Sequence, residues 1–142
     1  MIKLEELTQV TTKDLEEINS LIPQLSSSAK PLTNARFLEM LKDIRMPILV
    51  LRDGQKIVGI AMIVIYNVLT EKRAWIEEVT IDEKYRGKGL GEQLSKALIE
   101  IAKKERVQTV YLSSRPSREA ANKLYQKLGF EQKETNVYRL KL

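Results

Sequence analysis

The chain has 142 residues and contains neither cysteine nor histidine. Without cysteine it can form no disulfide bond, no thiolate nucleophile and no cysteine-based metal site. Without histidine it lacks the usual base of Ser-His and Cys-His catalysis and the commonest metal ligand. We therefore expect no metal, and any acid–base chemistry has to come from Glu, Asp, Tyr, Lys or water.

Long hydrophobic runs are also missing. No apolar stretch is long enough to span a bilayer, and the segment Met1–Glu6 lacks the apolar core of a signal peptide. These features predict a cytoplasmic protein with no membrane partner. Hydrophobic residues make up 43% of the chain and charged residues 30%, as in soluble globular proteins. The length suits one domain covering residues 1–142.

The formal net charge is +5. This excess indicates either a solvated basic surface or attraction to a polyanion, such as a nucleic acid or a phosphate-rich cofactor. Charge alone does not decide between them. The basic residues are spread among many acids, and no aromatic and basic platform stands out, so the pattern disfavours a nucleic-acid partner.

The spacing of apolar residues predicts an α/β (α+β) fold, in which helices pack on a sheet. Asp53-Gly54 is typical of a hairpin turn, and the run 57–65 is apolar on both faces, as in a central, doubly buried strand. We expect a mixed, mostly antiparallel central sheet of about six to seven strands flanked by about four helices. The expected strands lie at 2–10, 48–51, 56–66, 75–82 and 107–113, with a final hairpin in 130–142, and the expected helices lie near 12–22, 33–45, 90–102 and 116–128.

The stretch Arg86-Gly87-Lys88-Gly89-Leu90-Gly91 follows an expected strand and precedes an expected helix. Its alternating glycines allow a sharp turn and close approach to a ligand, and the helix start offers unpaired N–H groups. Two basic side chains in the same turn add to a site that suits phosphate or pyrophosphate. The spacing fits neither a mononucleotide P-loop nor a Rossmann loop. A tight turn without a ligand is the alternative reading.

Two motifs together resemble a known family. Arg86-x-x-Gly89-x-Gly91, with the strand residues 79–85 before it, is similar to the acyl-CoA pyrophosphate loop of the GNAT N-acetyltransferase superfamily. The segment 120–130, Ala-Ala-Asn-Lys-Leu-Tyr-Gln-Lys-Leu-Gly-Phe, resembles that family's Ala-x-x-Leu-Tyr-x-x-Leu-Gly-Phe ending. The resemblance covers residues 75–131, and the first 45 residues match only in the order of elements. It implies acetyl-CoA as cosubstrate and an amine as acceptor, either a small-molecule amine or a peptide amine.

The resemblance also implies where the donor binds. The pyrophosphate is expected on the backbone N–H groups of residues 87–92, and the pantetheine arm is expected to pair with the backbone of the preceding strand. Ser113 and Ser114 are expected near that arm, although strand-end hydroxyls bonding to nearby backbone are at least an equal alternative. Arg118 stands where many relatives carry Asn, and its guanidinium could meet a CoA phosphate. The expected cofactor-binding residues are Val79, Thr80, Ile81, Arg86, Gly87, Lys88, Gly89, Leu90, Gly91, Glu92, Ser113 and Arg118.

Three residues are candidates for catalysis. Tyr125 matches the family's tyrosine that protonates the departing CoA thiolate, although an amphipathic tyrosine with a wet hydroxyl is the alternative. Glu77 and Glu78 are candidate bases for an ammonium, and a β-bulge could turn both towards the cleft. Their alternative is a solvent-facing pair or an ion pair with Lys72 or Arg73. The sequence does not choose between the two carboxylates.

The missing cysteine bears on mechanism as well. An acetyl-cysteine intermediate is impossible, so we expect direct attack of the amine on the thioester in a ternary complex. Glu71, Glu77 and Glu78 suit a cationic acceptor, such as a polyamine, an amino sugar or a peptide amine. A non-catalytic acyl-CoA-binding or sensing module is the competing hypothesis. We expect a monomer or a homodimer, with acceptor specificity set by residues 12–22, 33–45 and 67–73.

Overall fold

A computed structural model describes all 142 residues and divides them into two compact units, residues 1–112 and residues 113–142. The first unit contains the sheet and the helices that cover it, and the second contains one helix, α4 (Glu119–Lys127). The elements of the first unit are β1 (Ile2–Glu6), α1 (Thr12–Leu25), α2 (Asn34–Leu41), β2 (Ile48–Asp53), β3 (Lys56–Asn67), β4 (Lys72–Ile81), the 3-10 helix η1 (Glu83–Tyr85), α3 (Leu90–Lys104) and β5 (Thr109–Tyr111).

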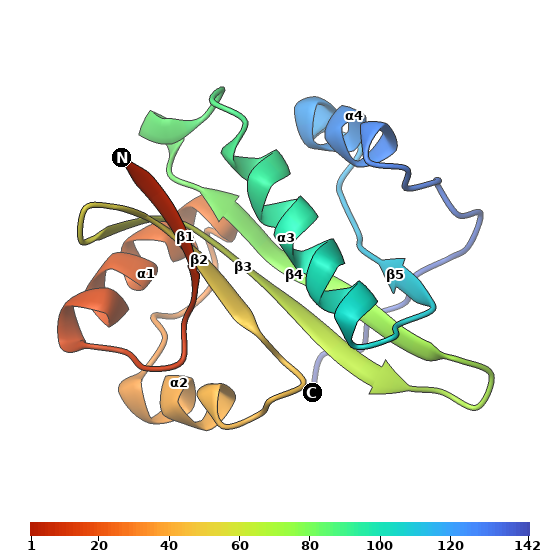
Figure 1. Ribbon diagram of the computed structural model, residues 1–142, viewed down its shortest axis with the longest axis horizontal. Coiled ribbons are helices and arrows are strands. Elements are labelled where there is room, and N and C mark those ends of the chain that lie inside the picture. Colours follow the sequence, from red (N-terminus) through yellow and green to blue (C-terminus); the bar gives the residue numbers. More distant parts are fainter. The chain divides into compact units, whose positions relative to one another are not determined.

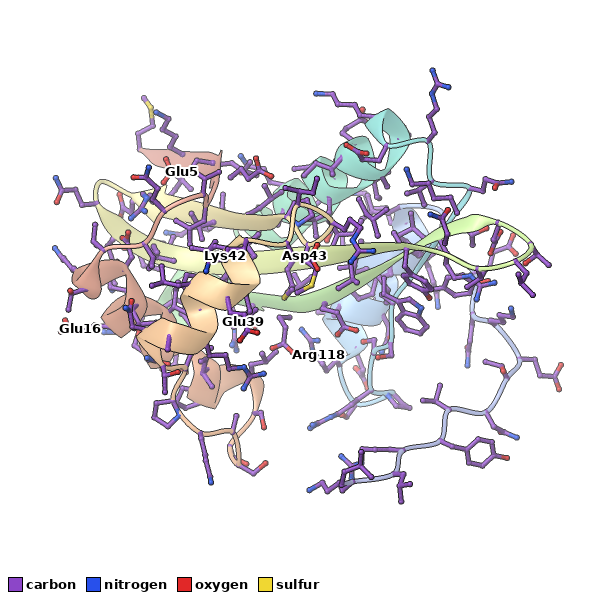
Figure 2. The ribbon with its side chains drawn as sticks, turned by 90° about the horizontal axis from the view of Figure 1, so that it is seen from below. Glu5, Glu16, Glu39, Lys42, Asp43 and Arg118 are labelled. Carbon is purple, nitrogen blue, oxygen red and sulfur yellow. The ribbon has the colours of Figure 1, made fainter.

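The sheet has five strands in the order β1-β2-β3-β4-β5. The first three pairs are antiparallel, and only β4 and β5 run parallel. Helices α1 and α2 lie on one face of this sheet and α3 lies on the other (Figure 1 and Figure 2). The predicted α/β class and the mostly antiparallel sheet are therefore confirmed.

The strand count is lower than the predicted six to seven. The expected final hairpin is absent, because residues 130–142 form no strand. Their apolar side chains stay in solvent, with Val137 78% and Tyr138 88% exposed. An isolated two-stranded hairpin is marginal in water unless it buries an apolar face. Residues 131–134 carry no apolar side chain with which to form such a face.

Helix α1 starts with a capping box. The Thr11 hydroxyl accepts a hydrogen bond from the Asp14 backbone N–H at 3.0 Å, and the Asp14 carboxylate accepts one from the Thr11 N–H at 3.1 Å. The helix was expected to end near Pro23 but continues to Leu25. Proline removes one helical hydrogen bond. The helix still closes with a hydrogen bond at its C-terminal end, because the Ser26 N–H donates to the Ile22 carbonyl at 2.9 Å.

The apolar sides of α1 and α2 form a core with the sheet. Ile18 and Leu21 of α1 and Phe37 of α2 are at most 3% exposed. They pack with Leu7, Ile48, Val50 and Ile57. On the other face, α3 buries Leu90, Leu94, Leu98 and Ala102 of the apolar residues that recur at helical spacing, while Ala97 and Ile101 of the same set are half-buried.

An arginine on β2 fastens α1 to the sheet. Arg52 bonds to the Glu5 carboxylate of β1 through Nε and to Asp14 Oδ1 of α1 at 2.8 Å through Nη1. The hydrogen bond from Arg52 holds the pKa of Asp14 below its ordinary value, although burial opposes this. Farther along α1, the Glu17 carboxylate accepts the Ile57 N–H of β3 at 2.8 Å. The N-terminal half of α1 is thus tied to β1, β2 and β3.

Strand β3 is central, as predicted, but only its start is buried on both faces. Residues 57–59 are all buried, and from residue 60 onward buried and half-buried side chains alternate. Ile60, Met62, Val64 and Tyr66 are the half-buried residues. The expected doubly buried strand therefore holds for its first part alone.

Gly59 of β3 leaves no room for a side chain. A Cβ there would lie 2.9 Å from Ile81 Cδ1 and 3.1 Å from Leu51 Cδ1. We expect Gly59→Val to lower the free energy of unfolding by about 2 kcal/mol, because overpacking a core typically costs 1–3 kcal/mol. Urea unfolding measures this change.

Gly54 offers a contrast to Gly59, because its φ is 60° and nothing lies within 4 Å of its added Cβ. Gly54→Ala should cost about 1 kcal/mol through backbone strain alone. A Gly59→Val variant as stable as the wild type would contradict the packing described for β3.

Several strand limits differ from those expected. β1 ends at Glu6 rather than residue 10, β4 begins at Lys72 rather than residue 75, and β5 spans only Thr109–Tyr111. The parallel β4–β5 pairing joins residues 73–75 to residues 109–111 and goes no further. No helix in the structure has both the length and the apolar composition needed to cross a membrane.

Candidate functional site

The glycine loop, residues 82–91, connects β4 to α3. Gly87 and Gly89 have φ values of 78° and 77°, which favour glycine. A Cβ at either position would meet nothing within 4 Å, so the space beside the loop is open. Gly89 is the N-cap of α3 and provides no side-chain cap. The N–H groups of the first turn are therefore presented without a capping acceptor, as an anion site requires.

The side chains of the loop differ in what they can offer a ligand. Leu90 is buried and contributes only backbone, while Glu92 pairs with Lys96 at 3.1 Å. Lys88 lies with its ammonium 5.2 Å from the centre of the Tyr85 ring. Arg86 donates from Nε to the Ile81 carbonyl at 3.0 Å and from Nη2 to Gln24 Oε1 at 3.3 Å. Both basic side chains therefore make contacts within the protein. Arg86 still has N–H groups that donate no hydrogen bond in these contacts.

Strand β4 has a free side next to the loop. β5 pairs only with residues 73–75, so no strand pairs with residues 76–81 on that side within the first unit. On the other side, Thr80 pairs with Ile60 and Ile81 pairs with Gly59. An extended ligand segment could add to this edge by backbone hydrogen bonds, as peptides do on exposed sheet edges. The stretch includes Val79, Thr80 and Ile81, which the family resemblance implies as residues that bind the donor.

A β-bulge interrupts β4 at the two adjacent glutamates. Met62 pairs with Glu77 and Ile60 pairs with Thr80, so β4 has one residue more than β3 between these pairs. Glu78 has a φ of 63°, which is rare for a residue other than glycine. Strict alternation would put Glu78 on the face of the buried Ile76, but both glutamates are exposed. The bulge lets the two carboxylates avoid the core.

Both carboxyl groups hold their protons more tightly than usual. Partial desolvation raises the pKa of Glu77. Desolvation also raises the pKa of Glu78, and the neighbouring charge of Glu77 raises it further. The predicted alternative partners are engaged elsewhere, because Lys72 donates to the Glu105 carbonyl at 2.7 Å and Arg73 pairs with Glu71 at 2.8 Å. Raised carboxyl pKa values are typical of groups that accept protons in catalysis.

In the second unit, Tyr125 lies on α4 and is 7% exposed. Its ring meets Phe130 edge to face, with 6.0 Å between ring centres. Burial raises the pKa of its hydroxyl, and the charge of Arg118 opposes that shift. The Tyr125 hydroxyl is therefore buried and protonated at neutral pH. Gly129 follows the C-terminal end of this helix with a φ of 100°, which is typical of a glycine that ends a helix.

The other residues predicted in the second unit behave differently. Arg118 is the exposed N-cap of α4, which begins at Glu119 rather than at residue 116. Ser113 is exposed, whereas the Ser114 hydroxyl is buried and finds no hydrogen-bond partner. A buried, unpaired hydroxyl requires an explanation. Ser114 is thus a stronger candidate than Ser113 for meeting a ligand, and no sequence pattern separates these adjacent serines.

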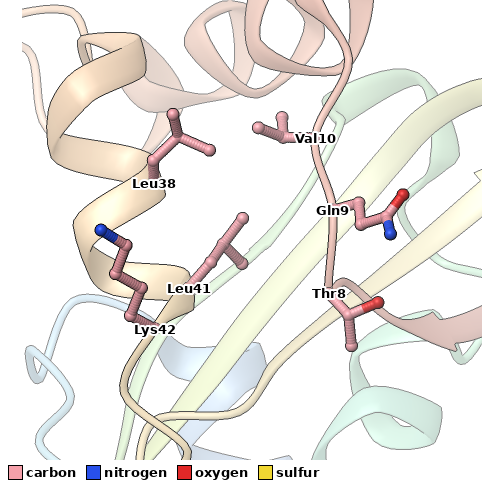
Figure 3. A pocket seen from close by; sticks show the side chains of 6 residues that line it. All are labelled: Thr8, Gln9, Val10, Leu38, Leu41 and Lys42. Atoms are coloured by element: carbon pink, nitrogen blue, oxygen red, sulfur yellow. The ribbon is translucent and has the colours of Figure 1, made fainter.

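A hollow in the first unit lies away from these groups, between the residues before α1 and helix α2 (Figure 3). Its volume is about 350 Å³. Lys42 is the one charged residue that lines this hollow. Glu39 and Asp43 lie near Lys42, at the end of α2 and just after it (Figure 2). None of the candidate catalytic residues lines it. No cluster of three or more metal-ligating side chains exists in the structure. The lining residues are Thr8, Gln9, Val10, Leu38, Leu41 and Lys42.

The sequence matches the acetyltransferase (GNAT) family over residues 12–130. The match includes the glycine loop, the bulged strand and α4, and it spans most of the chain. The protein therefore belongs to the GNAT acetyltransferase family.

Individual relatives agree with this assignment. A spermine/spermidine N(1)-acetyltransferase of Bacillus subtilis strain 168 is 42% identical over 60 residues, which cover 42% of this chain and 40% of that protein. The match thus spans less than half of the curated relative. A crystal structure of an acetyltransferase from Trypanosoma brucei is 29% identical, covers 100% of both chains and has a TM-score of 0.84. A transcriptional regulator from Bacillus halodurans C-125 is 27% identical, covers 99% of both chains and has a TM-score of 0.83.

Proposed function

We propose that this protein is an N-acetyltransferase that moves the acetyl group of acetyl-CoA directly to a primary amine. The observation that carries the proposal is the free side of β4, which runs past the bulge at Glu78 straight into the glycine loop. An extended arm along that edge would bring its phosphates to the start of α3. Family membership supports acetyl-CoA as the donor. We propose that the whole chain works as one acetyltransferase domain.

The donor is proposed to bind through backbone more than through side chains. The N–H groups of residues 87–92 would hold the pyrophosphate, and Arg86 and Lys88 would add positive charge. The backbone of residues 79–81 would pair with the pantetheine arm and polarise the thioester carbonyl. The residues present fit such a group, because the loop is open where a side chain would stand at Gly87 and Gly89.

The catalytic roles are proposed from chemistry and position in the chain. Glu77 or Glu78 would take a proton from the acceptor ammonium, directly or through water, and their raised pKa values support this role. Tyr125 would give a proton to the departing thiolate, and its buried, protonated hydroxyl supports that role. The attacking nitrogen forms the new C–N bond as the C–S bond breaks, so no covalent enzyme intermediate is needed.

The acceptor is proposed to be a cationic amine of the polyamine type. The exposed carboxylates of Glu77 and Glu78 would attract it electrostatically. The name of the Bacillus subtilis relative supports this class. Glu71 would attract the cationic acceptor less than the sequence indicated, because its carboxylate is already paired with Arg73.

The pH dependence follows from the carboxyl groups. A base works in its ionised form, so kcat/KM should fall as the pH drops through the pKa of the glutamate that acts as base. That pKa is raised above the ordinary glutamate value of about 4.3. Glu77→Gln removes a neighbouring negative charge and should lower the pKa of Glu78. A pH–rate profile, with carboxyl titration followed by NMR, checks both statements. An unchanged Glu78 titration in the variant would contradict the coupling.

The test of the proposal uses the purified full chain. Calorimetry should detect CoA and acetyl-CoA binding, and a thiol-release assay over polyamines, amino sugars, peptide amines and amino acids should find at least one acceptor. Binding of acetyl-CoA without turnover on any amine would favour the non-catalytic acyl-CoA-binding module. Absence of binding to either form of CoA would overturn both functions.

A further inference from the structure

The first half of the glycine loop is fixed by contacts from three other elements. The Asp82 N–H donates to the Val58 carbonyl of β3 at 2.9 Å. The Tyr85 hydroxyl donates to Asp53 at the end of β2 at 2.8 Å. The Glu83 N–H donates to Gln24 Oε1 at 3.0 Å. The second half, with its two left-handed glycines, has open space beside it.

Gln24 makes two of these contacts with a single oxygen. It lies in the last turn of α1, and its Oε1 accepts from the Glu83 N–H and from Arg86 Nη2, at 3.0 and 3.3 Å. The Ile81 carbonyl accepts from Arg86 Nε at 3.0 Å. The guanidinium therefore donates hydrogen bonds from two of its nitrogens. Three of its five N–H groups remain for another acceptor.

A guanidinium recognises phosphate through a planar fork, so its orientation matters as much as its charge. Arg86 is exposed, and without a partner its long side chain would sample many rotamers. The contacts to Gln24 and Ile81 restrict it before any ligand arrives, and such restriction reduces the entropy lost on binding.

We infer that Gln24 is a positioning residue for the donor site, which orients the Arg86 guanidinium towards the CoA pyrophosphate. This inference rests on the proposed function. It makes the end of α1 part of the donor site, although the sequence assigned that helix to acceptor specificity alone.

The test is a double-mutant cycle on CoA affinity, measured by calorimetry on the full chain at one salt concentration. Gln24→Ala should weaken CoA binding about fivefold, since the one hydrogen bond that orients Arg86 contributes about 1 kcal/mol. Arg86→Ala should weaken it more. If Gln24 acts through Arg86, adding Gln24→Ala to Arg86→Ala should change the affinity by less than about twofold.

Kinetics and a control complete the design. Gln24→Ala should raise the KM for acetyl-CoA and leave kcat and the acceptor KM nearly unchanged, and inorganic pyrophosphate should compete with CoA less well. Gln9→Ala, a matched change in the exposed segment before α1, should leave CoA affinity unaltered. Melting temperatures of all variants report on the fold.

The outcomes separate the two proposals. If the wild type binds no CoA, the proposed function fails and the inference fails with it. If the wild type binds CoA and Gln24→Ala binds it equally well, only the inference is overturned. Fully additive effects of the two substitutions would also overturn it, because Gln24 would then act independently of Arg86.

Discussion

Replacing Tyr125 with phenylalanine should lower kcat about 100-fold or more, because loss of a general acid typically costs a factor of 10² to 10⁴. The departing thiolate would then have to take its proton from water. The raised pKa of this hydroxyl keeps it protonated through the neutral range, so the wild type loses the acid only at strongly alkaline pH. Steady-state kinetics with saturating acetyl-CoA and acceptor measure the effect.

The substitution keeps what a purely structural tyrosine would need. Phenylalanine retains the ring and its edge contact with Phe130, so stability should change little. CoA affinity should also stay near that of the wild type, which separates chemistry from binding. Phe130→Leu is a useful comparison, since it alters the packing but leaves the hydroxyl in place. A Tyr125→Phe variant with wild-type kcat would remove Tyr125 from the proposed mechanism.

Replacing Arg52 with methionine should lower the free energy of unfolding by about 3 kcal/mol, because removal of one partner of a buried ion pair typically costs 3–5 kcal/mol. The Arg52 side chain is 17% exposed and that of Asp14 is 10% exposed. The substitution leaves the Asp14 carboxylate largely buried without its cation. In a domain of this size the melting temperature should fall by about 10 °C.

The Arg52–Asp14 pair also makes the stability of the fold depend on pH in acid. The folded-state pKa of Asp14 is depressed, so its stabilisation is present above its unfolded value near 4 and is lost as the pH falls through the folded value. The difference in stability between wild type and Arg52→Met should therefore shrink in acid. Arg45→Met, which removes an exposed pair with Asp43, should change stability by less than about 1 kcal/mol. Equal effects of the two substitutions would contradict the role given to Arg52.

The elements that local chemistry specifies were predicted well. Asp53-Gly54 lies in the predicted hairpin turn between β2 and β3, and most of the apolar residues at helical spacing in α3 lie on its buried face. The turn from β4 to α3 was also predicted from sequence, because glycine readily adopts the positive φ that Gly87 and Gly89 have there. Each of these features depends on residues a few positions apart.

Features that depend on distant partners were missed or left open. Gln24 lies 62 positions before Arg86, and nothing in its local sequence marks it as different from other exposed glutamines. The bulge could be suspected but not placed, since its position depends on how β3 and β4 align. The final hairpin failed for the same reason, because its alternating residues predict a strand only if an apolar surface covers them.

The bulge at Glu78 divides β4 into two parts that differ in how they pair with other strands. Residues 72–77 are tied into the sheet by β3, with β5 joined to residues 73–75, and residues 80–81 are tied by β3 alone. A bulge is a local bend with extra twist, so small adjustments on one side need not travel through the ladder to the other. The end of the strand next to the glycine loop can thus settle against a ligand while the aromatic stack of Trp75 on Tyr111 stays in register. Glu78 thus lies between residues 73–75, which pair with a strand on each side, and residues 80–81, which pair with β3 alone.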